Sequence, residues 1–179
     1  MNCIKYDIIA IIGKSASGKD SIVKEIAKHC NKEVALIRQT TTRPRRENEN
    51  ENAYHFVSLK EFQSNKDIIA KTKFREWFYG TDLKDLAIDK WNIGVFTPWS
   101  VRMLLNDDNE KINNLIIFYI QADNRIRLER SLAREPQGDV IEMCRRMLAD
   151  DRDFGDTELT FDYYPILNNQ KDDFKKAIG

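Results

Sequence analysis

The sequence has few of the features that mark secreted, membrane-spanning or metal-stabilised proteins. Its 179 residues include only three cysteines, Cys3, Cys30 and Cys144, which form no C-x-x-C pair. Neither a disulfide framework nor a zinc site is therefore predicted. No apolar run reaches the ~18 residues that a membrane span needs. Lys plus Arg and Asp plus Glu number 29 each, and this balance argues against a general nucleic-acid binder. We expect no nucleic acid and no membrane as partners, and a reducing, cytoplasmic location.

The composition is that of an ordinary globular domain, with 41% hydrophobic and 32% charged residues. Two β-branched runs, at residues 5–12 and 115–120, predict strands that are buried on both faces. Strand-like and helical segments alternate, which predicts an α/β domain with a mostly parallel central sheet. Helices are expected at 21–29, 59–65, 101–105, 124–134, 140–152 and 172–178. Further strands are expected at 34–40, 54–58, 92–97 (stopped by Pro98) and 163–167, and residues 74–81 are rich in aromatics.

A phosphate-binding loop follows the first predicted strand. The residues that fit the pattern G-x-x-x-x-G-K are Gly13, Lys14, Ser15, Ala16, Ser17, Gly18 and Lys19. Small residues let successive backbone N–H groups point at a phosphate, and the following helix N-terminus adds partial positive charge. Lys19 supplies a full positive charge. The flanking strand and helix provide the expected context, so the sequence predicts a bound nucleoside triphosphate.

The residue after the lysine departs from the usual pattern. A Ser or Thr that ligates Mg²⁺ normally stands there, whereas this chain has Asp20, followed by Ser21. Two interpretations are open. The Asp20 carboxylate holds the Mg²⁺ ion through its water shell, or it only stabilises the helix through its interaction with the positive end of the helix dipole.

A basic segment, Thr40 to Arg46, places three hydroxyls and three guanidinium groups in seven residues. Arginine is suited to bidentate recognition of phosphate. Taken alone, the segment is also typical of a solvated loop whose charge is balanced by Glu47, Glu49 and Glu51.

Several segments together resemble the guanylate kinase family. That family follows its phosphate loop with a segment like S-T-T-R-x-P-R-x-x-E, a tyrosine and F-V-S, and here the chain reads TTTRPRRENE, Tyr54 and HFVS. The segment WFYGT, at residues 77–81, is similar to the family's Y-Y-G-S/T, and YYPILNN, at 163–169, is similar to its late strand. Arg134 and the pair Arg145 and Arg146 resemble its lid arginines. The similarity covers nearly the whole chain in the family's order.

The resemblance implies a P-loop NTPase fold and a phosphotransferase. It implies a core of about residues 1–40 and 90–179, a nucleotide-monophosphate lobe of about 41–89 and an arginine lid of about 130–146. The implied reaction is transfer from ATP, with Mg²⁺, to GMP, dGMP or another deoxynucleoside monophosphate, by a monomer or homodimer. Such a reaction depends on in-line positioning and on neutralising charge at the transferring group.

The resemblance also assigns roles to residues. Residues 13–21 would bind ATP, with Asn168 near its adenine. The residues that would hold the acceptor phosphate are Thr41, Thr42, Arg43, Arg46 and Tyr54. Tyr79 and Thr81 would contact the acceptor. Those around the transferring phosphoryl group would be Lys19, Arg134 and either Arg145 or Arg146.

The chain departs from the family where guanine is read. Guanine-specific members carry a Glu before the Y-Y-G segment, and counting back from Gly80 places Ala70 there. Their D-x-D stretch is replaced by residues 95–99. Loss of buried acceptors weakens base selection strongly, so guanine specificity is not carried over. Thr97, Trp99 and Ser100 are candidates for a differently read base site, with packing in the core as the alternative for Trp99.

Two other functions are kept as alternatives. A Gly-Lys-Asp loop also occurs in ribose 1,5-bisphosphate phosphokinase, although the TTR and FVS segments favour a nucleotide acceptor. A non-catalytic guanylate-kinase-like module that binds proteins would typically lack the lysine or the lid arginines, which are present here. The acidic residues 150, 151 and 153 are interpreted as a solvated helix end.

Overall fold

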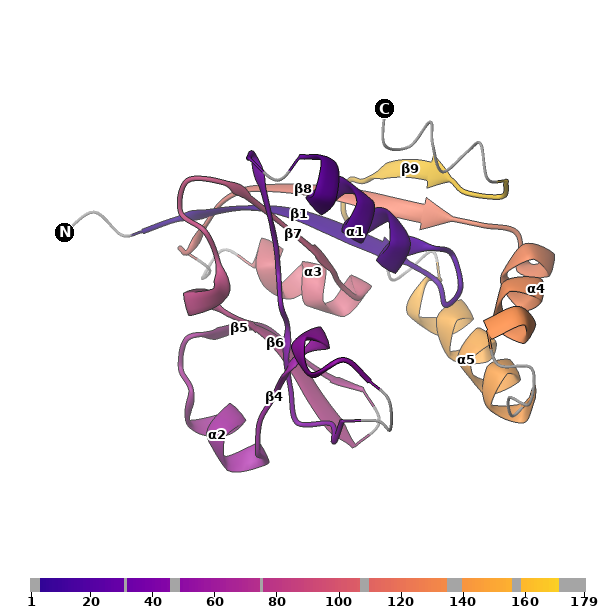
Figure 1. Cartoon of the computed structure of the whole chain (residues 1–179), viewed down its shortest axis with the longest axis horizontal. Coiled ribbons are helices and arrows are strands. Elements are labelled where there is room, and N and C mark those ends of the chain that lie inside the picture. Colours follow the sequence, from indigo (N-terminus) through magenta and orange to yellow (C-terminus); the bar gives the residue numbers. More distant parts are fainter. Residues whose placement is uncertain are drawn as a thin grey trace.

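The structure is a computed structural model that describes residues 4–30, 32–45, 49–74, 76–106, 110–134, 140–155 and 159–170. Its main sheet has five strands in the order β2-β7-β1-β8-β9, and all neighbours in it are parallel (Figure 1). The elements that make up or flank this sheet are β1 (Tyr6–Gly13), α1 (Lys19–His29), β2 (Val34–Leu36), β7 (Trp91–Val95), α3 (Pro98–Leu105), β8 (Ile112–Gln121), α4 (Asn124–Arg134), α5 (Val140–Asp153) and β9 (Tyr164–Leu167). The predicted α/β class with a parallel central sheet is confirmed.

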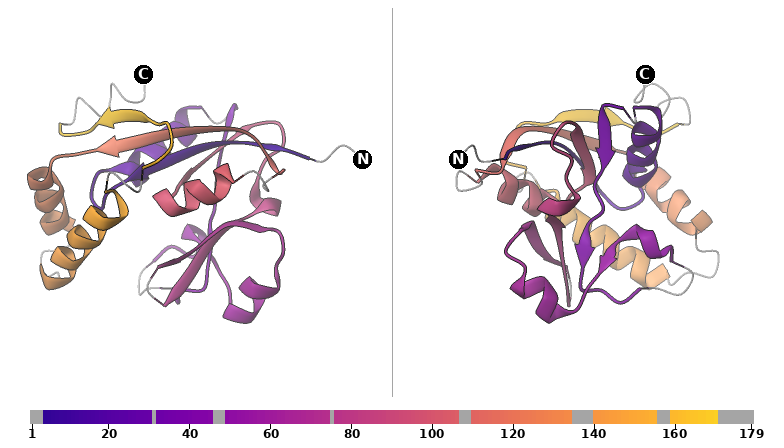
Figure 2. Two further views of the ribbon diagram at one scale, coloured as in Figure 1. Left: turned by 180° about the vertical axis from the view of Figure 1, so that it is seen from behind. Right: turned by 60° about the vertical axis from the view of Figure 1, so that its left-hand side comes forward.

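A second sheet, of four short strands, lies below the main sheet in the view of Figure 1. Its order is β4-β3-β6-β5, with β3 and β4 parallel and the other pairs antiparallel. Its elements are β3 (Thr40–Thr41), the 3-10 turn η1 (Glu51–Ala53), β4 (His55–Phe56), α2 (Leu59–Ser64), β5 (Ile68–Phe74), β6 (Trp77–Asp82) and the 3-10 turn η2 (Leu83–Asp85). Helix α3 lies between the two sheets (Figure 2).

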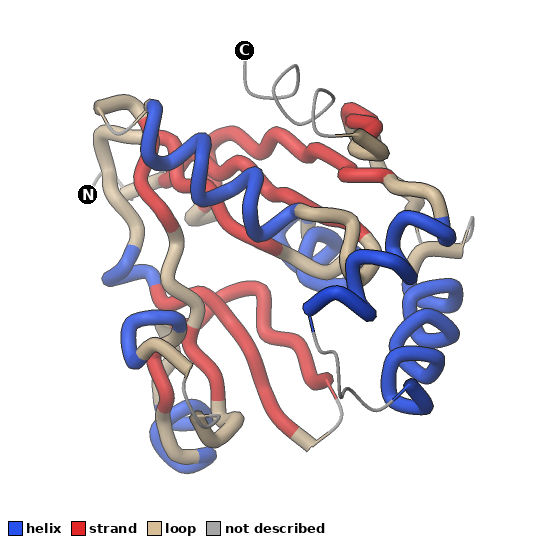
Figure 3. The backbone as a smooth tube through the Cα atoms, turned by 45° about the vertical axis from the view of Figure 1, so that its right-hand side comes forward, coloured by secondary structure: helices blue, strands red, loops and turns tan. Residues whose placement is uncertain are grey.

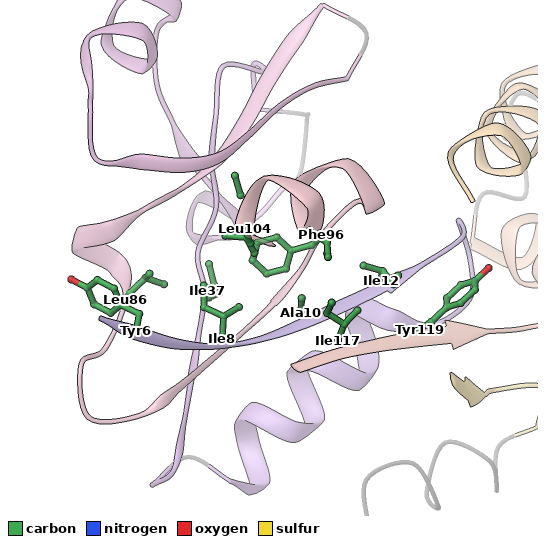
Figure 4. Close-up of a cluster of buried hydrophobic side chains, with 12 residues drawn as sticks. Tyr6, Ile8, Ala10, Ile12, Ile37, Leu86, Phe96, Leu104, Ile117 and Tyr119 are labelled. Atoms are coloured by element: carbon green, nitrogen blue, oxygen red, sulfur yellow. The ribbon is translucent and has the colours of Figure 1, made fainter. Parts of the chain in front are cut away.

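Strand β1 supplies the core on both faces of the main sheet because successive side chains of a strand point in opposite directions. Ile8, Ala10 and Ile12 join the cluster on the α3 side, which Figure 4 shows together with Phe96 and Leu104. Ile11 joins the other cluster, beneath α1. Burial on both faces explains why this strand reads as a continuous apolar run.

Most predicted elements are confirmed, with boundaries that differ by a few residues. The helix expected at 124–134 is α4, and the two apolar runs are β1 and β8. The helix expected at 59–65 is α2, where Ser58 and Glu61 form a capping box. The segment 172–178 lies outside the described residues.

The structure differs from the expected elements in three places, in one of which the helix expected at 101–105 begins three residues earlier. The single strand expected at 34–40 is two strands in different sheets, β2 and β3, because the chain crosses between the sheets there. Strand β5 was not expected. Pro98 does not only stop a strand but begins α3, because proline fits the first helical position and Thr97 caps the helix.

None of the described helices is both long and apolar enough to cross a membrane.

Candidate active site

The phosphate-binding loop adopts the turn that its small residues permit. Ala16 and Gly18 have left-handed backbone conformations, with φ of 59° and 94°. The Ser17 N–H donates to the Lys14 carbonyl oxygen at 3.2 Å, and α1 begins directly at Lys19. The loop therefore leads into the positive end of a helix, as an anion-binding loop requires.

Gly13 is required where β1 enters this loop. A Cβ atom at residue 13 would lie 2.7 Å from the Ile120 carbonyl oxygen and 2.6 Å from Ser17 Oγ. We expect Gly13→Ala to lower the free energy of unfolding by about 1–3 kcal/mol, because backbone cannot move aside as a flexible side chain can. Gly155→Ala is the matched control, since its Cβ would meet nothing closer than 3.5 Å. Urea unfolding of both variants checks this, and equal midpoints would contradict it.

A cavity of about 360 Å³ opens beside the loop, between the main sheet, the second sheet and α5. Six predicted site residues besides Gly13 and Ser15 line it, namely Lys19, Asp20, Tyr54, Tyr79, Thr97 and Arg146. Residues that the sequence had not singled out for a role also line it, including Gln39, Thr72, Phe74, Trp77, Asp150 and Asp153. The fold thus brings residues from six separate stretches of the chain to one space, namely 13–20, 39, 54, 72–79, 95–100 and 146–154.

Lys19 and Asp20 stand at the loop side of the cavity. The Lys19 side chain is mostly buried, whereas that of Asp20 is 60% exposed, and Lys19 Nζ lies 4.0 Å from Asp20 Oδ2. Burial, and then the charge of Asp20, raise the pKa of Tyr54 above its usual value. Tyr54 is therefore a neutral phenol that can donate a hydrogen bond across the neutral pH range.

Tyr54 and Tyr79 form the opposite side, with their rings in edge contact at 6.1 Å between centroids. Arg43 packs against the Tyr54 ring, with its guanidinium carbon 5.5 Å from the ring centre. Arg43 Nη2 also donates to both carboxylate oxygens of Glu49, at 2.7 and 3.0 Å. This hydrogen bond is the main reason that the pKa of Arg43 is raised. Arg43 is thus a buried, paired support and does not line the cavity.

Three predicted acceptor contacts lie away from the cavity. The Thr41 hydroxyl donates to the Phe78 carbonyl oxygen at 2.9 Å, and Thr42 Oγ1 accepts the Phe78 N–H at 2.9 Å. Thr81 is fully buried, and its hydroxyl has no hydrogen-bond partner among the residues that the structure describes. The first two hydroxyls join β3 to β6, and none of the three is among the residues that line the cavity.

The start of α3 forms another wall. Thr97 Oγ1 accepts the Ser100 N–H at 3.1 Å, so this hydroxyl caps the helix while it faces the cavity. Trp99 is 55% exposed, and the interpretation of it as core was wrong. Ala70, where the family's Glu would fall, is buried in the core cluster with φ of 51°. The pairing of β5 with β6 shifts register between Ile69 and Thr72. Within this stretch, Thr72 is the residue that lines the cavity.

The two adjacent arginines of α5 have different positions. Arg146 lines the cavity with Lys19 and also lines a wider neighbouring groove of about 1,110 Å³. Arg145 is exposed and lines that groove, but it is not among the described residues that line the cavity. Arg46 and the side chain of Arg134 lie outside the described parts of the structure.

Residues from α4 and α5 that were not assigned a role contact the phosphate loop. Arg127, which is 2% exposed, donates from Nε to the Ser15 carbonyl oxygen at 2.9 Å. Asp150, expected in a solvated helix end, instead accepts the Ser15 N–H at 2.8 Å. Figure 3 shows both helices on the side of the molecule where the loop enters α1. Arg127 and Arg130, three residues apart on α4, both face the loop, and this helical spacing was the available signal.

Asn168, predicted near the adenine, is buried against the same loop. Its side-chain amide donates to the Ser17 carbonyl oxygen at 2.8 Å.

Comparisons with known proteins agree on one family. The sequence profile of the family described as guanylate kinase matches residues 5–178. A guanylate kinase of Campylobacter jejuni (strain RM1221) is 28% identical over 149 residues, which cover 78% of this chain and 71% of that protein. One of Mycoplasmopsis pulmonis is 34% identical over 95 residues, or 49% of this chain and 47% of its own length. The crystal structure of guanylate kinase from Anaplasma phagocytophilum has a TM-score of 0.62 at 19% identity, covering 99% of this chain and 82% of that one.

Proposed function

The chain belongs to the guanylate kinase family and is a nucleoside monophosphate kinase, and from this premise we propose the donor, the acceptor and the residues that serve them. The donor is ATP, which binds at residues 13–21. The acceptor is a nucleoside or deoxynucleoside monophosphate in the cavity between the loop and the second sheet. The proposed division is a core of about 1–40 and 90–179, an acceptor lobe of about 41–89 and a lid of about 130–146.

The observation that carries this proposal is the shared cavity. Lys19 and Arg146, two cations from segments far apart in the chain, face the same space as Tyr54 and Tyr79. Phosphoryl transfer places negative charge on equatorial oxygens between two nucleotides in line. Cations at the donor side and hydroxyls at the acceptor side are the groups that such a transfer needs.

The proposed roles follow from these positions. Lys19 and Arg146 neutralise charge on the transferring group, and Tyr54 and Tyr79 hold the acceptor's phosphate. Arg43 fixes the orientation of Tyr54 through its contact with the ring and its pair with Glu49. Closure of the arginine-bearing segment over the nucleotides would exclude water, so that ATP is not hydrolysed.

Asp20 is the residue that would hold Mg²⁺, through water. Its exposed carboxylate lines the cavity beside Lys19, and Mg²⁺ keeps several waters when it is bound by one or two carboxylates. When bound, the ion would neutralise charge on the β- and γ-phosphates. Thr97, at the end of the neighbouring strand, uses its hydroxyl to cap α3, which leaves Asp20 as the better candidate.

The acceptor's base is proposed to be read without the family's guanine-binding carboxylates. Ala70 packs in the core. The wall of the cavity after β7 is formed by the hydroxyls of Thr97 and Ser100 with Pro98. The buried carboxylate that does line the cavity, Asp150, is already hydrogen-bonded to Ser15 and Arg127. Without the family's two carboxylates, we do not expect guanine to be discriminated by the 10⁴–10⁵ that unpaired polar groups provide.

The first test is ADP release from ATP and Mg²⁺ with a panel of acceptors. The panel is GMP, dGMP, dAMP, dCMP, dTMP, dUMP and ribose 1,5-bisphosphate. We expect turnover of one or more monophosphates, with less than about a tenfold advantage for GMP or dGMP in kcat/KM. A guanine advantage of about 10⁴ would contradict the proposed base site. Turnover of ribose 1,5-bisphosphate alone would show that the acceptor is a sugar phosphate and not a nucleotide. No turnover with any acceptor, despite measurable ATP binding, would contradict the proposal as a whole.

A further inference from the structure

A buried ion pair binds one residue of the phosphate loop, Ser15, at both its backbone N–H and its carbonyl oxygen. Asp150, on α5, accepts the Ser15 N–H at Oδ2 (2.8 Å) and the Ser15 hydroxyl at Oδ1 (3.1 Å). Arg127, on α4, donates from Nε to the Ser15 carbonyl oxygen at 2.9 Å and from Nη2 to Asp150. Both polar groups of the Ser15 backbone are therefore bound by this pair, across more than 100 residues of sequence.

The surroundings of the pair fix it in place. The side chains of Arg127 and Asp150 are only 2% and 13% exposed. Arg127 Nη1 makes a further bond to Asn124 Oδ1 at 2.8 Å, so all three nitrogens of the guanidinium are used. Separating such a pair would leave a buried charge uncompensated, which is strongly unfavourable. The pair is thus a permanent connection rather than a contact that opens when a nucleotide binds.

The same helix carries an arginine that lines the cavity. Arg146 lies four residues before Asp150, which is one turn of α5, so the two side chains share a face of the helix. Both line the cavity beside Lys19. Asp150 consequently fixes the distance between the loop that would bind the triphosphate and the arginine that would meet the transferring phosphoryl group.

We infer that Asp150 and Arg127 are positioning residues for phosphoryl transfer: they clamp Ser15 to α5 and thereby hold Arg146 in register with the phosphate loop. The inference rests on the proposed function. It implies that the Ser15 N–H serves the clamp and not a phosphate oxygen.

The neighbouring pair provides a matched control. Lys14 Nζ contacts Asp151 Oδ1 at 2.6 Å, also between the loop and α5, but these side chains are 25% and 55% exposed. Lys14 lowers the pKa of Asp151, as expected for a surface pair. Solvated pairs of this kind contribute little, so Asp151→Ala should leave kcat near that of the wild type.

The test measures kcat, KM for ATP, ATP binding and Tm in Asp150→Ala, Asp151→Ala and the double variant Arg127→Met/Asp150→Ala. We expect Asp150→Ala to lower kcat by about 100-fold, the loss that a misplacement of roughly 1 Å can produce, with KM for ATP little changed. Its Tm should fall because Arg127 is left unpaired. In the double variant no buried charge is unpaired, so Tm should recover while kcat stays low. This separation of Tm from kcat is what a purely structural role would not produce.

Other results would overturn the inference. If kcat recovers together with Tm in the double variant, the pair serves stability only. If Asp150→Ala binds ATP more tightly with kcat unchanged, the carboxylate competes with the nucleotide and does not position Arg146. If the wild type turns over no acceptor, the proposed function fails first, whereas a normal wild type with an unaffected Asp150→Ala variant removes the clamp alone.

Discussion

In a Lys19→Met protein, kcat is expected to fall by about 10³-fold or more while the fold persists. Lys19 provides the full positive charge of the phosphate loop, is mostly buried and lines the cavity with Arg146. Removing one charged group from a preorganised phosphoryl-transfer site costs at least as much as removing one oxyanion donor, about 10²–10³ in kcat. Methionine keeps most of the volume of the side chain, so the packing of the first turn of α1 should survive. Steady-state ADP release at saturating ATP and acceptor measures the effect.

Lys24→Met is the control for this change, because Lys24 is an exposed lysine on the same helix. It should retain the activity and the unfolding midpoint of the wild type. Retention of more than a tenth of the wild-type kcat by Lys19→Met would mean that the loop lysine does not take part in the reaction.

Replacement of Arg146 by methionine is expected to lower kcat by about 10³-fold, the low end for an arginine that stabilises the transferring phosphoryl group. Replacement of Arg145 should cost less than about tenfold, or 1.36 kcal/mol. The sequence presents these two residues as equivalent, but of the two, Arg146 is the one found among the described residues that line the cavity, while both line the wider groove. KM for the acceptor should change less than kcat in Arg146→Met, because the interaction strengthens as charge develops in the transition state.

The two variants control each other, since they remove the same group from adjacent residues of α5. A larger loss for Arg145→Met would show that lid closure rotates α5 far enough to exchange the two side chains. That outcome would also contradict the clamp at Asp150, which holds the helix against the loop one turn away.

Local sequence was sufficient wherever neighbours in the chain make the structure. The phosphate loop is one contiguous segment, and its conformation depends on the backbone of its own glycines and on the helix that begins at Lys19. The helix at 124–134 and the two buried strands were predicted because hydrophobic periodicity reports which face of an element is covered. The family was also evident from the sequence, because its motifs occur in order along nearly the whole chain.

The acceptor side was predicted less well. Tyr54, Tyr79 and Thr97 reach the cavity, but the hydroxyls of Thr41 and Thr42 are hydrogen-bonded to the Phe78 backbone, 37 and 36 residues away. A motif identifies the residues in a segment, but it does not show which of their polar groups are already hydrogen-bonded within the second sheet.

By itself, the sequence determined the class of fold, the phosphate loop and the family. Tertiary structure decided which arginine of α5 meets the cavity, that Trp99 is exposed, and that Asp150 and Arg127 hold Ser15. The physical reason is the range of the interactions. From sequence, an acidic helix end is predicted to be solvated, because no residue close to it in the chain pairs with it. In the structure Asp150 accepts three hydrogen bonds, two from Ser15, 135 residues away, and one from Arg127. Only the packing of α4 and α5 on the loop creates that low-dielectric site.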